Sequence, residues 1–237
     1  TGKKIMFGPV VDHEYYEGHP YVNGFIKETE NVPLICGSVF GEFLNNFASP
    51  AGEGCKNTWL LEYTKQQLHQ EYGEMADFLP EIFKKIYPEK NIADLLFLDG
   101  EMRRNALEFA KLRAESSEAG VYNFLFNLES PFNGGTVPWH NAEIPYIFHN
   151  AEYLESSFIP DVTPMLQNIV SRAWINFASN GNPNGAGVPL WMAVTKEKNH
   201  TMVFDRNCSC REDHDRELLA VLPVRKVNLF KLMGKKK

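Results

Sequence analysis

The sequence is poor in the features that mark several large classes of protein. Its 237 residues include four cysteines, too few for a small scaffold held together by disulfides. Basic residues number 24 against 30 acidic ones, which argues against a nucleic-acid surface because such a surface needs a basic patch. No apolar run approaches the length of a membrane span, and no apolar leader opens the chain. We therefore expect a globular protein with no membrane span and no nucleic-acid partner.

Metal-binding patterns are also scarce. Cys208 and Cys210 are separated by one serine, and no second Cys/His pair with zinc-like spacing accompanies them. Cys36 stands in an apolar run and is interpreted as a small buried hydrophobe. We expect neither a metal nor a cofactor. The cysteine usage favours a reducing cytoplasm, with secretion left open as the alternative.

Strand and helix patterns alternate along the chain. Short apolar runs predict strands at 32–37 and 121–128, both buried on two faces, and a shorter strand at 201–204. Amphipathic helices are predicted where apolar residues recur at intervals of three and four, over 57–72, 74–87, 99–118 and 163–180. This alternation is typical of the α/β class.

Two or three strands are few for a free-standing sheet, so we expect residues 1–237 to form part of a single larger domain. The first two strands should be interior members of a larger mixed sheet. The apolar helix faces at 75–86 and 165–177 should pack against the rest of that domain. Such a chain should bind the complementary part of the same protein or associate with itself as a homo-oligomer.

One histidine stands where a general base is expected. His140 follows the strand at 121–126 and a Gly/Pro-rich loop at 133–138, and it precedes a short apolar run. This order of strand, loop, histidine and helix holds an imidazole over the carboxyl edge of a sheet. The alternative is that His140 only forms hydrogen bonds that stabilise the loop and has no catalytic role. The other six histidines, at positions 13, 19, 69, 149, 200 and 214, have polar or capping contexts.

A catalytic histidine needs a carboxylate that orients its ring. Glu42 is the leading candidate because it follows the first strand through a glycine turn, and such strand ends point into the crevice of α/β sheets. Glu42 could also be the N-terminal carboxylate of a helix over 43–47, and the two roles are compatible. Glu143, three residues after His140, is the competitor. Trp139 and Phe40 flank the pair and either line a substrate pocket or pack in the core.

The serine nucleophile that would complete such a site is missing. No serine has glycine two residues away on both sides, so the G-x-S-x-G elbow is absent. An HGGG-like oxyanion loop is absent as well. In α/β-hydrolases the chain order is Ser, then Asp/Glu, then His, and Glu42 and His140 obey only its second half.

Several segments, in order, resemble the C-terminal half of the type-B carboxylesterases, the cholinesterase-like branch of the α/β-hydrolases. Residues 7–12 (FGPVVD) are similar to the family's PVVDG segment, and 31–38 (NVPLICGS) to its VPLLIGST strand. Residues 121–126 (VYNFLF) resemble VYxYxF, 140–148 (HNAEIPYIF) resemble HGAELPYVF, and 174–184 (WINFASNGNPN) resemble WxNFAxxGxPN.

The resemblance implies an α/β fold, the C-terminal half of an α/β-hydrolase, with mostly parallel or mixed strands flanked by helices. It implies a Ser-Glu-His triad that hydrolyses a small-molecule carboxylic ester, with Glu42 and His140 as two of its members. The serine and the oxyanion donors would come from the N-terminal half of the same enzyme. This chain alone would then be inactive.

The chain departs from the family pattern at three positions near these motifs. Glu42 lies between Gly41 and Phe43 rather than between Asp and Gly. Asn141 replaces the glycine after the histidine, and His13 replaces the glycine after Asp12. The family also includes non-catalytic adhesion proteins that have lost triad residues. A binding or adhesion module on the same fold is therefore the alternative function.

Overall fold

The computed structural model describes residues 9–44 and 55–224. The strands are β1 (Leu34–Val39), β2 (Val121–Phe126), β3 (His200–Phe204) and β4 (Ser209–Glu212). The helices are α1 (Pro20–Asn23), α2 (Leu61–Tyr72), α3 (Leu79–Ile86), α4 (Gly100–Ser116), α5 (Ile144–Ile147), α6 (Thr163–Asn180) and α7 (Arg216–Val221). Residues 7 and 8 of the first family segment, and most of the helix considered over 43–47, lie outside the described residues.

The four strands form one mixed sheet in the order β1-β2-β3-β4. β1 is parallel to β2, from Leu34 opposite Val121 to Val39 opposite Phe126, and β2 is parallel to β3. β4 turns back antiparallel to β3. This mixed sheet flanked by helices confirms the predicted fold class. β4 was not predicted, because Ser209–Glu212 contains no apolar alternation.

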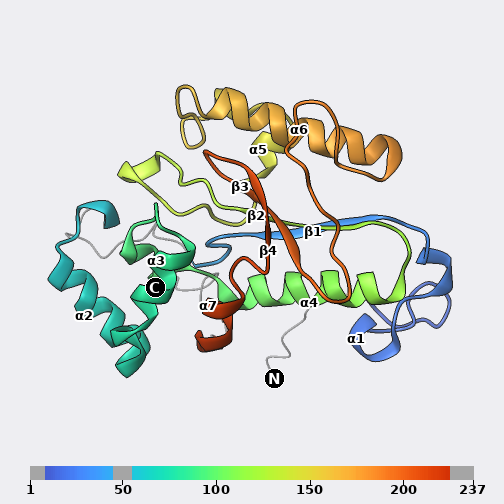
Figure 1. The fold of residues 1–237 in the computed structure, drawn as a ribbon, viewed down its shortest axis with the longest axis horizontal. Helices are drawn as coiled ribbons and strands as arrows, with labels where there is room; N and C mark the ends of the chain where they lie inside the picture. The colour runs from blue at the N-terminus through green and yellow to red at the C-terminus, as the bar shows by residue number, and fades with distance from the viewer. Residues whose placement is uncertain (1–8, 45–54, 225–237) are drawn as a thin grey trace, which may run out of the picture.

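The side chains of β2 explain why helices cover both faces of the sheet. Tyr122, Phe124 and Phe126 belong to the core that α6 covers, whereas Leu125 and Val121 belong to cores on the other face. Successive side chains of a strand point to opposite faces, so one apolar strand serves two layers. Figure 1 shows α6 along one side of the sheet and α4 along the other. No described helix is long and apolar enough to cross a membrane.

The predicted helices form with shifted boundaries. The region predicted as one helix over 74–87 is a 3₁₀ segment, Gly73–Asp77, followed by α3, whose second residue is Pro80. Proline lacks the N–H that an uninterrupted helix would need there, so the helix restarts. α6 agrees closely with its prediction and ends at Gly181, which has a left-handed φ of 76°.

The apolar helix faces at 75–86 and 165–177, which we expected to pack against another part of the protein, are largely buried within this chain. Leu79 and Phe83 of α3 are fully buried in one core, and Leu166 and Val170 of α6 are buried in another. Only single positions such as Met165, 45% exposed, face outward. The expectation for 75–86 and 165–177 was therefore wrong. It overlooked that the sheet of this chain offers two faces to pack on.

Candidate active site

The ends of two parallel neighbouring strands bring the Glu42 turn and the His140 loop together. β1 and β2 end at paired residues, so the segments that follow them leave the same edge of the sheet. The Gly41 N–H donates to the Pro138 carbonyl over 2.9 Å, and the His140 N–H donates to the Glu42 carbonyl over 2.9 Å. Backbone hydrogen bonds therefore fix the register of the two segments before any side chain is considered.

Within this frame Glu42 binds the imidazole of His140. Oε2 of Glu42 lies 2.7 Å from Nδ1 of His140, and Oε1 accepts the Val39 N–H over 2.7 Å. The Glu42 side chain is only 7% exposed, so both carboxylate oxygens are held by protein groups in a buried position. An ionised carboxylate accepts hydrogen bonds only, so Nδ1 carries the proton and Nε2 is left as the basic nitrogen of the neutral ring.

Nε2 of His140 is the open end of this unit. The His140 side chain is 49% exposed, and among the described residues its ring hydrogen bonds go to Glu42 alone. A ring fixed at Nδ1 with an accessible Nε2 can take a proton from a nearby hydroxyl and return it.

Glu143 does not take the orienting position. Its Oε2 is buried and has no hydrogen-bond partner among the described groups. Burial raises the pKa of Glu143, and the Glu42 charge raises it further. Of the two carboxylates considered, the structure therefore brings Glu42 to His140.

Backbone geometry explains the departures around these residues. A Cβ on Gly41 would lie 2.7 Å from both the Leu44 and the Pro138 carbonyl oxygens, so the acid turn requires glycine before Glu42. Asn141 has φ 73° and His13 has φ 59°, both in the left-handed region. The family's glycines at these positions would be unstrained there, and Asn and His are among the side chains that tolerate it best.

The two flanking aromatics have different surroundings. Phe40 is fully buried, with its ring 6.4 Å from Phe83 and 5.4 Å from Tyr87 between centroids, and Lys90 lies over it. These are the contacts of a core residue, the alternative considered for Phe40. Trp139 is partly exposed beside His140, and its place in a substrate pocket stays a prediction.

A buried lysine holds the segment between β2 and His140, and no sequence pattern indicates this role. Lys56 is fully buried. Its Nζ lies 2.6 Å from Asp94 and also pairs with Glu129, which lies between β2 and the loop at 133–138. Burial alone would lower the pKa of Lys56, but the Asp94 and Glu129 charges raise it overall. Asn57 adds a bond from its Nδ2 to Glu129 over 3.0 Å. A lysine among polar residues is expected on the surface, so only the fold reveals this role.

The other histidines have structural or surface roles in the described chain. Their partners are Glu17 for His13, the Tyr21 N–H for His19, Asp77 for His69, Asn168 for His149, the Ala193 carbonyl for His200 and Arg211 for His214. Within the described residues no three His, Cys, Asp or Glu side chains are grouped to hold a metal.

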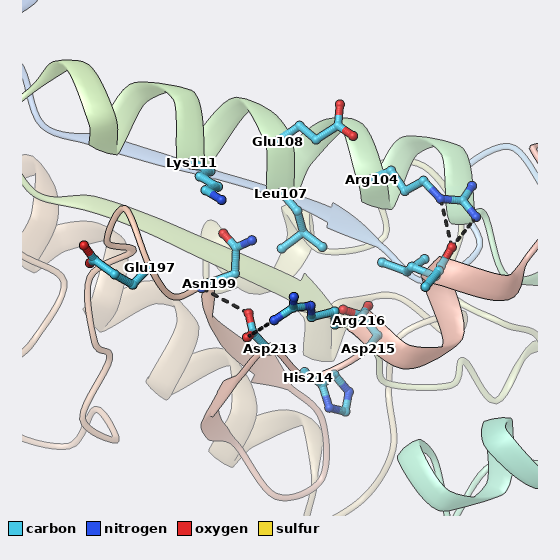
Figure 2. A pocket seen from close by; sticks show the side chains of 12 residues that line it. Arg104, Leu107, Glu108, Lys111, Glu197, Asn199, Asp213, His214, Asp215 and Arg216 are labelled. Atoms are coloured by element: carbon cyan, nitrogen blue, oxygen red, sulfur yellow. Dashed lines mark hydrogen bonds and ion pairs between the residues drawn. The ribbon is translucent and has the colours of Figure 1, made fainter.

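A cavity of about 360 Å³ lies away from Glu42 and His140, between α4 and the turn that leads into α7. Figure 2 shows Arg104, Glu108 and Lys111 along α4, and Asp213 and Arg216 on the segment that leads into α7. Asp213 and Arg216 pair with each other over 3.2 Å. The lining carries four acidic and three basic side chains, a mixture too even to indicate a ligand class.

Comparison with known proteins identifies the family. The model of the carboxylesterase family matches residues 1–220. The chain belongs to the carboxylesterase family. Para-nitrobenzyl esterase of Bacillus subtilis is 28% identical over 220 residues, which are 90% of this chain and 42% of that protein. Human Neuroligin-2 is 28% identical over 209 residues, 76% of this chain and 24% of that protein.

A solved structure agrees with the fold. An esterase from anaerobic Clostridium hathewayi, described as able to hydrolyse aliphatic aromatic polyesters, superimposes with a TM-score of 0.79 and 32% identity. The match covers 87% of this chain and 40% of that protein. The chain thus spans about two fifths of the length of the esterases that it matches.

Proposed function

We propose that this chain supplies the acid and the base of a carboxylic ester hydrolase whose serine nucleophile lies outside these 237 residues. The observation that carries the proposal is the 2.7 Å bond between Glu42 and Nδ1 of His140, with Nε2 left accessible. Family membership supports ester hydrolysis as the reaction class. The absence of a G-x-S-x-G motif from the sequence supports an external nucleophile.

In the proposed reaction a serine hydroxyl attacks the ester carbonyl while Nε2 of His140 takes its proton. Glu42 accepts the Nδ1–H bond throughout and stabilises the imidazolium that forms. The proton then passes to the leaving alcohol, and an acyl-enzyme remains. Water repeats the sequence on the acyl group and releases the carboxylic acid. Backbone N–H donors outside this chain would hold the oxyanion, each worth roughly 3–4 kcal/mol.

The proposed partner is the N-terminal part of the same enzyme. β1 pairs with β2 on one side, and no described strand lies along its other edge. An open edge of a parallel sheet offers unpaired N–H and C=O groups to a further strand. A second copy of the chain is the other possible occupant of that edge.

The oligomeric state of the isolated chain checks this partner proposal. Light scattering should show a dimer or larger species alone, and a complex when the N-terminal part is present. A monodisperse monomer that stays stable at high concentration would contradict it.

An assay with a nitrophenyl ester tests the functional proposal. The purified chain should show no turnover by itself, and activity should appear when the nucleophile-bearing part is present. Turnover by the chain alone, abolished by His140→Ala, would show that a nucleophile lies within it.

A non-catalytic binding module on the same fold is the second candidate. The match to Neuroligin-2, whose name is not that of an esterase, favours keeping it. The sequence upstream of this chain discriminates the two functions. An intact G-x-S-x-G motif there supports the hydrolase, and a replaced serine supports the binding module.

A further inference from the structure

The residue after the acid covers the histidine. Phe43 follows Glu42 directly, and its ring centroid lies 4.6 Å from that of His140, with 31° between the ring planes. The family pattern quoted above has glycine at this position, so the contact comes from a side chain that the pattern lacks. Phe43 is partly exposed, which places it at the site rather than within a core.

The backbone around Phe43 is held from two directions. The Leu44 N–H donates to the Gly41 carbonyl over 2.5 Å, which closes the turn. The Phe43 N–H lies 3.4 Å from Oδ2 of Asp99, whose other oxygen caps α4 through the Met102 N–H over 3.1 Å. The Asp99 N–H donates to the Phe40 carbonyl over 3.0 Å. Asp99, at the start of α4, therefore hydrogen-bonds to the turn both before and after Glu42 and holds the backbone of Phe43 in place.

We propose that Phe43 is a positioning residue that holds the imidazole of His140 in its productive orientation. The inference rests on the proposed function, because it assigns Phe43 a role in the same ester hydrolysis. Phe43 itself touches neither serine nor substrate in this role. It acts through His140.

The geometry explains why a second contact is needed. The bond from Nδ1 to Glu42 and the Cβ–Cγ attachment hold one edge of the ring, but small changes of the χ1 and χ2 torsions can still tilt the ring. Such tilting would move Nε2 away from the hydroxyl it must deprotonate. The Phe43 ring lies against one face of the imidazole and limits tilting toward that side. An aromatic face also attracts a cation, so the contact strengthens when His140 becomes an imidazolium during the reaction.

Three substitutions in the complete esterase test the inference with nitrophenyl acetate as substrate. Phe43→Ala should lower kcat by about 10- to 100-fold, the cost of a misplaced catalytic group, and leave KM unchanged. Phe43→Tyr keeps the aromatic face and should restore kcat. Phe43→Leu keeps bulk without the aromatic face and should fall between them. Phe78→Ala, at a phenylalanine that is 43% exposed at the start of α3, is the control and should have no effect.

Other outcomes overturn the inference. A raised KM with unchanged kcat for Phe43→Ala would make Phe43 a substrate contact instead. If kcat and KM of Phe43→Ala equal the wild-type values, Phe43 has no role in positioning His140. The ring-current shift of the His140 ring protons, measured by NMR in wild type and Phe43→Ala, reports the ring contact without requiring activity. An inactive wild-type esterase that shows the shift would contradict the proposed function, whereas an active enzyme without the shift would contradict only the role of Phe43.

Discussion

Two buried carboxylates in this molecule each hold a nitrogen at 2.7 Å, and they differ in what surrounds the partner. Glu42 binds the half-exposed ring of His140, whereas Asp215 binds Nε of Arg103, a residue that is 1% exposed. Arg103 also donates to Asn123 and to Thr201, each over 2.8 Å. This network joins α4, β2, β3 and the start of α7.

The comparison separates a structural pair from a chemical one. Burial would raise the pKa of Asp215, but the charge and hydrogen bonds of Arg103 outweigh it and lower the pKa overall. The guanidinium is enclosed, so its charge only holds elements together. The His140 imidazole is held at one nitrogen and open at the other, which is the arrangement that proton transfer requires.

The largest expected effect comes from changing Glu42, the partner of the half-exposed His140. If the complete protein hydrolyses esters as proposed, Glu42→Gln in it should cut turnover by roughly 10⁴-fold, because an amide cannot stabilise the imidazolium. Folding should be nearly intact, since the amide keeps the shape of the side chain. Steady-state kinetics and thermal unfolding measure the two effects. Glu143→Gln is the control and should cost less; if it is the more damaging change, Glu42 is not the acid.

Breaking the buried pair of Arg103 and Asp215 should lower the stability of the fold instead. Arg103→Met leaves the Asp215 charge buried without its partner, which should lower the free energy of unfolding by about 3–5 kcal/mol. Arg103→Met combined with Asp215→Leu should recover most of that loss, because no lone charge remains. Urea denaturation measures both. Equal instability of the single and the double variant would show that the charge is not the cause.

The histidine beside Asp215 makes stability depend on pH. Burial lowers the pKa of His214 from 6.5 to about 4. Between pH 6.5 and about pH 4, His214 is therefore protonated in the unfolded chain but neutral in the folded chain. The free energy of unfolding is therefore highest above pH 6.5 and falls as the pH is lowered toward 4. The loss should approach about 3 kcal/mol. Urea denaturation across this range should show a decline that His214→Gln reduces; an unchanged decline would exclude His214 as its source.

The smallest effect is expected at an exposed pair. Lys198 and Glu212 lie 2.9 Å apart, and each side chain is 51% exposed. Lys198→Met should leave the free energy of unfolding almost unchanged, because a solvated ion pair contributes little to stability. Urea denaturation of Lys198→Met and Arg103→Met measures the two stability losses under the same conditions. Similar losses from the two changes would show that burial does not decide how much a charged pair contributes to stability.

The main elements of the fold could be predicted because their patterns are local. The apolar strands β1 and β2 and the long stripe of α6 are visible in the sequence. The break before α3 was missed although Pro80 signals it, and β4 was missed because its residues are polar. The edge position of β1 in this chain could not be predicted, since strand order depends on long-range pairing.

The candidate site divides in the same way. Glu42 and His140 could be named from strand ends and from the family resemblance, and the structure brings them into contact. Lys56 and Phe43 could not be named, because their roles arise only when distant segments meet. Asp99 left a weak signal, a helix-capping residue just before α4, but its hold on the acid turn is tertiary.

Labelling with a fluorophosphonate, which reacts with activated serines, shows whether the nucleophile lies outside this chain and depends on His140. The complete esterase is labelled, digested and analysed by mass spectrometry, with His140→Ala beside it. We expect a label on a serine upstream of this chain, none on any serine within these 237 residues, and strong loss of labelling in His140→Ala. A label on a serine of this chain, or full labelling in His140→Ala, would contradict it.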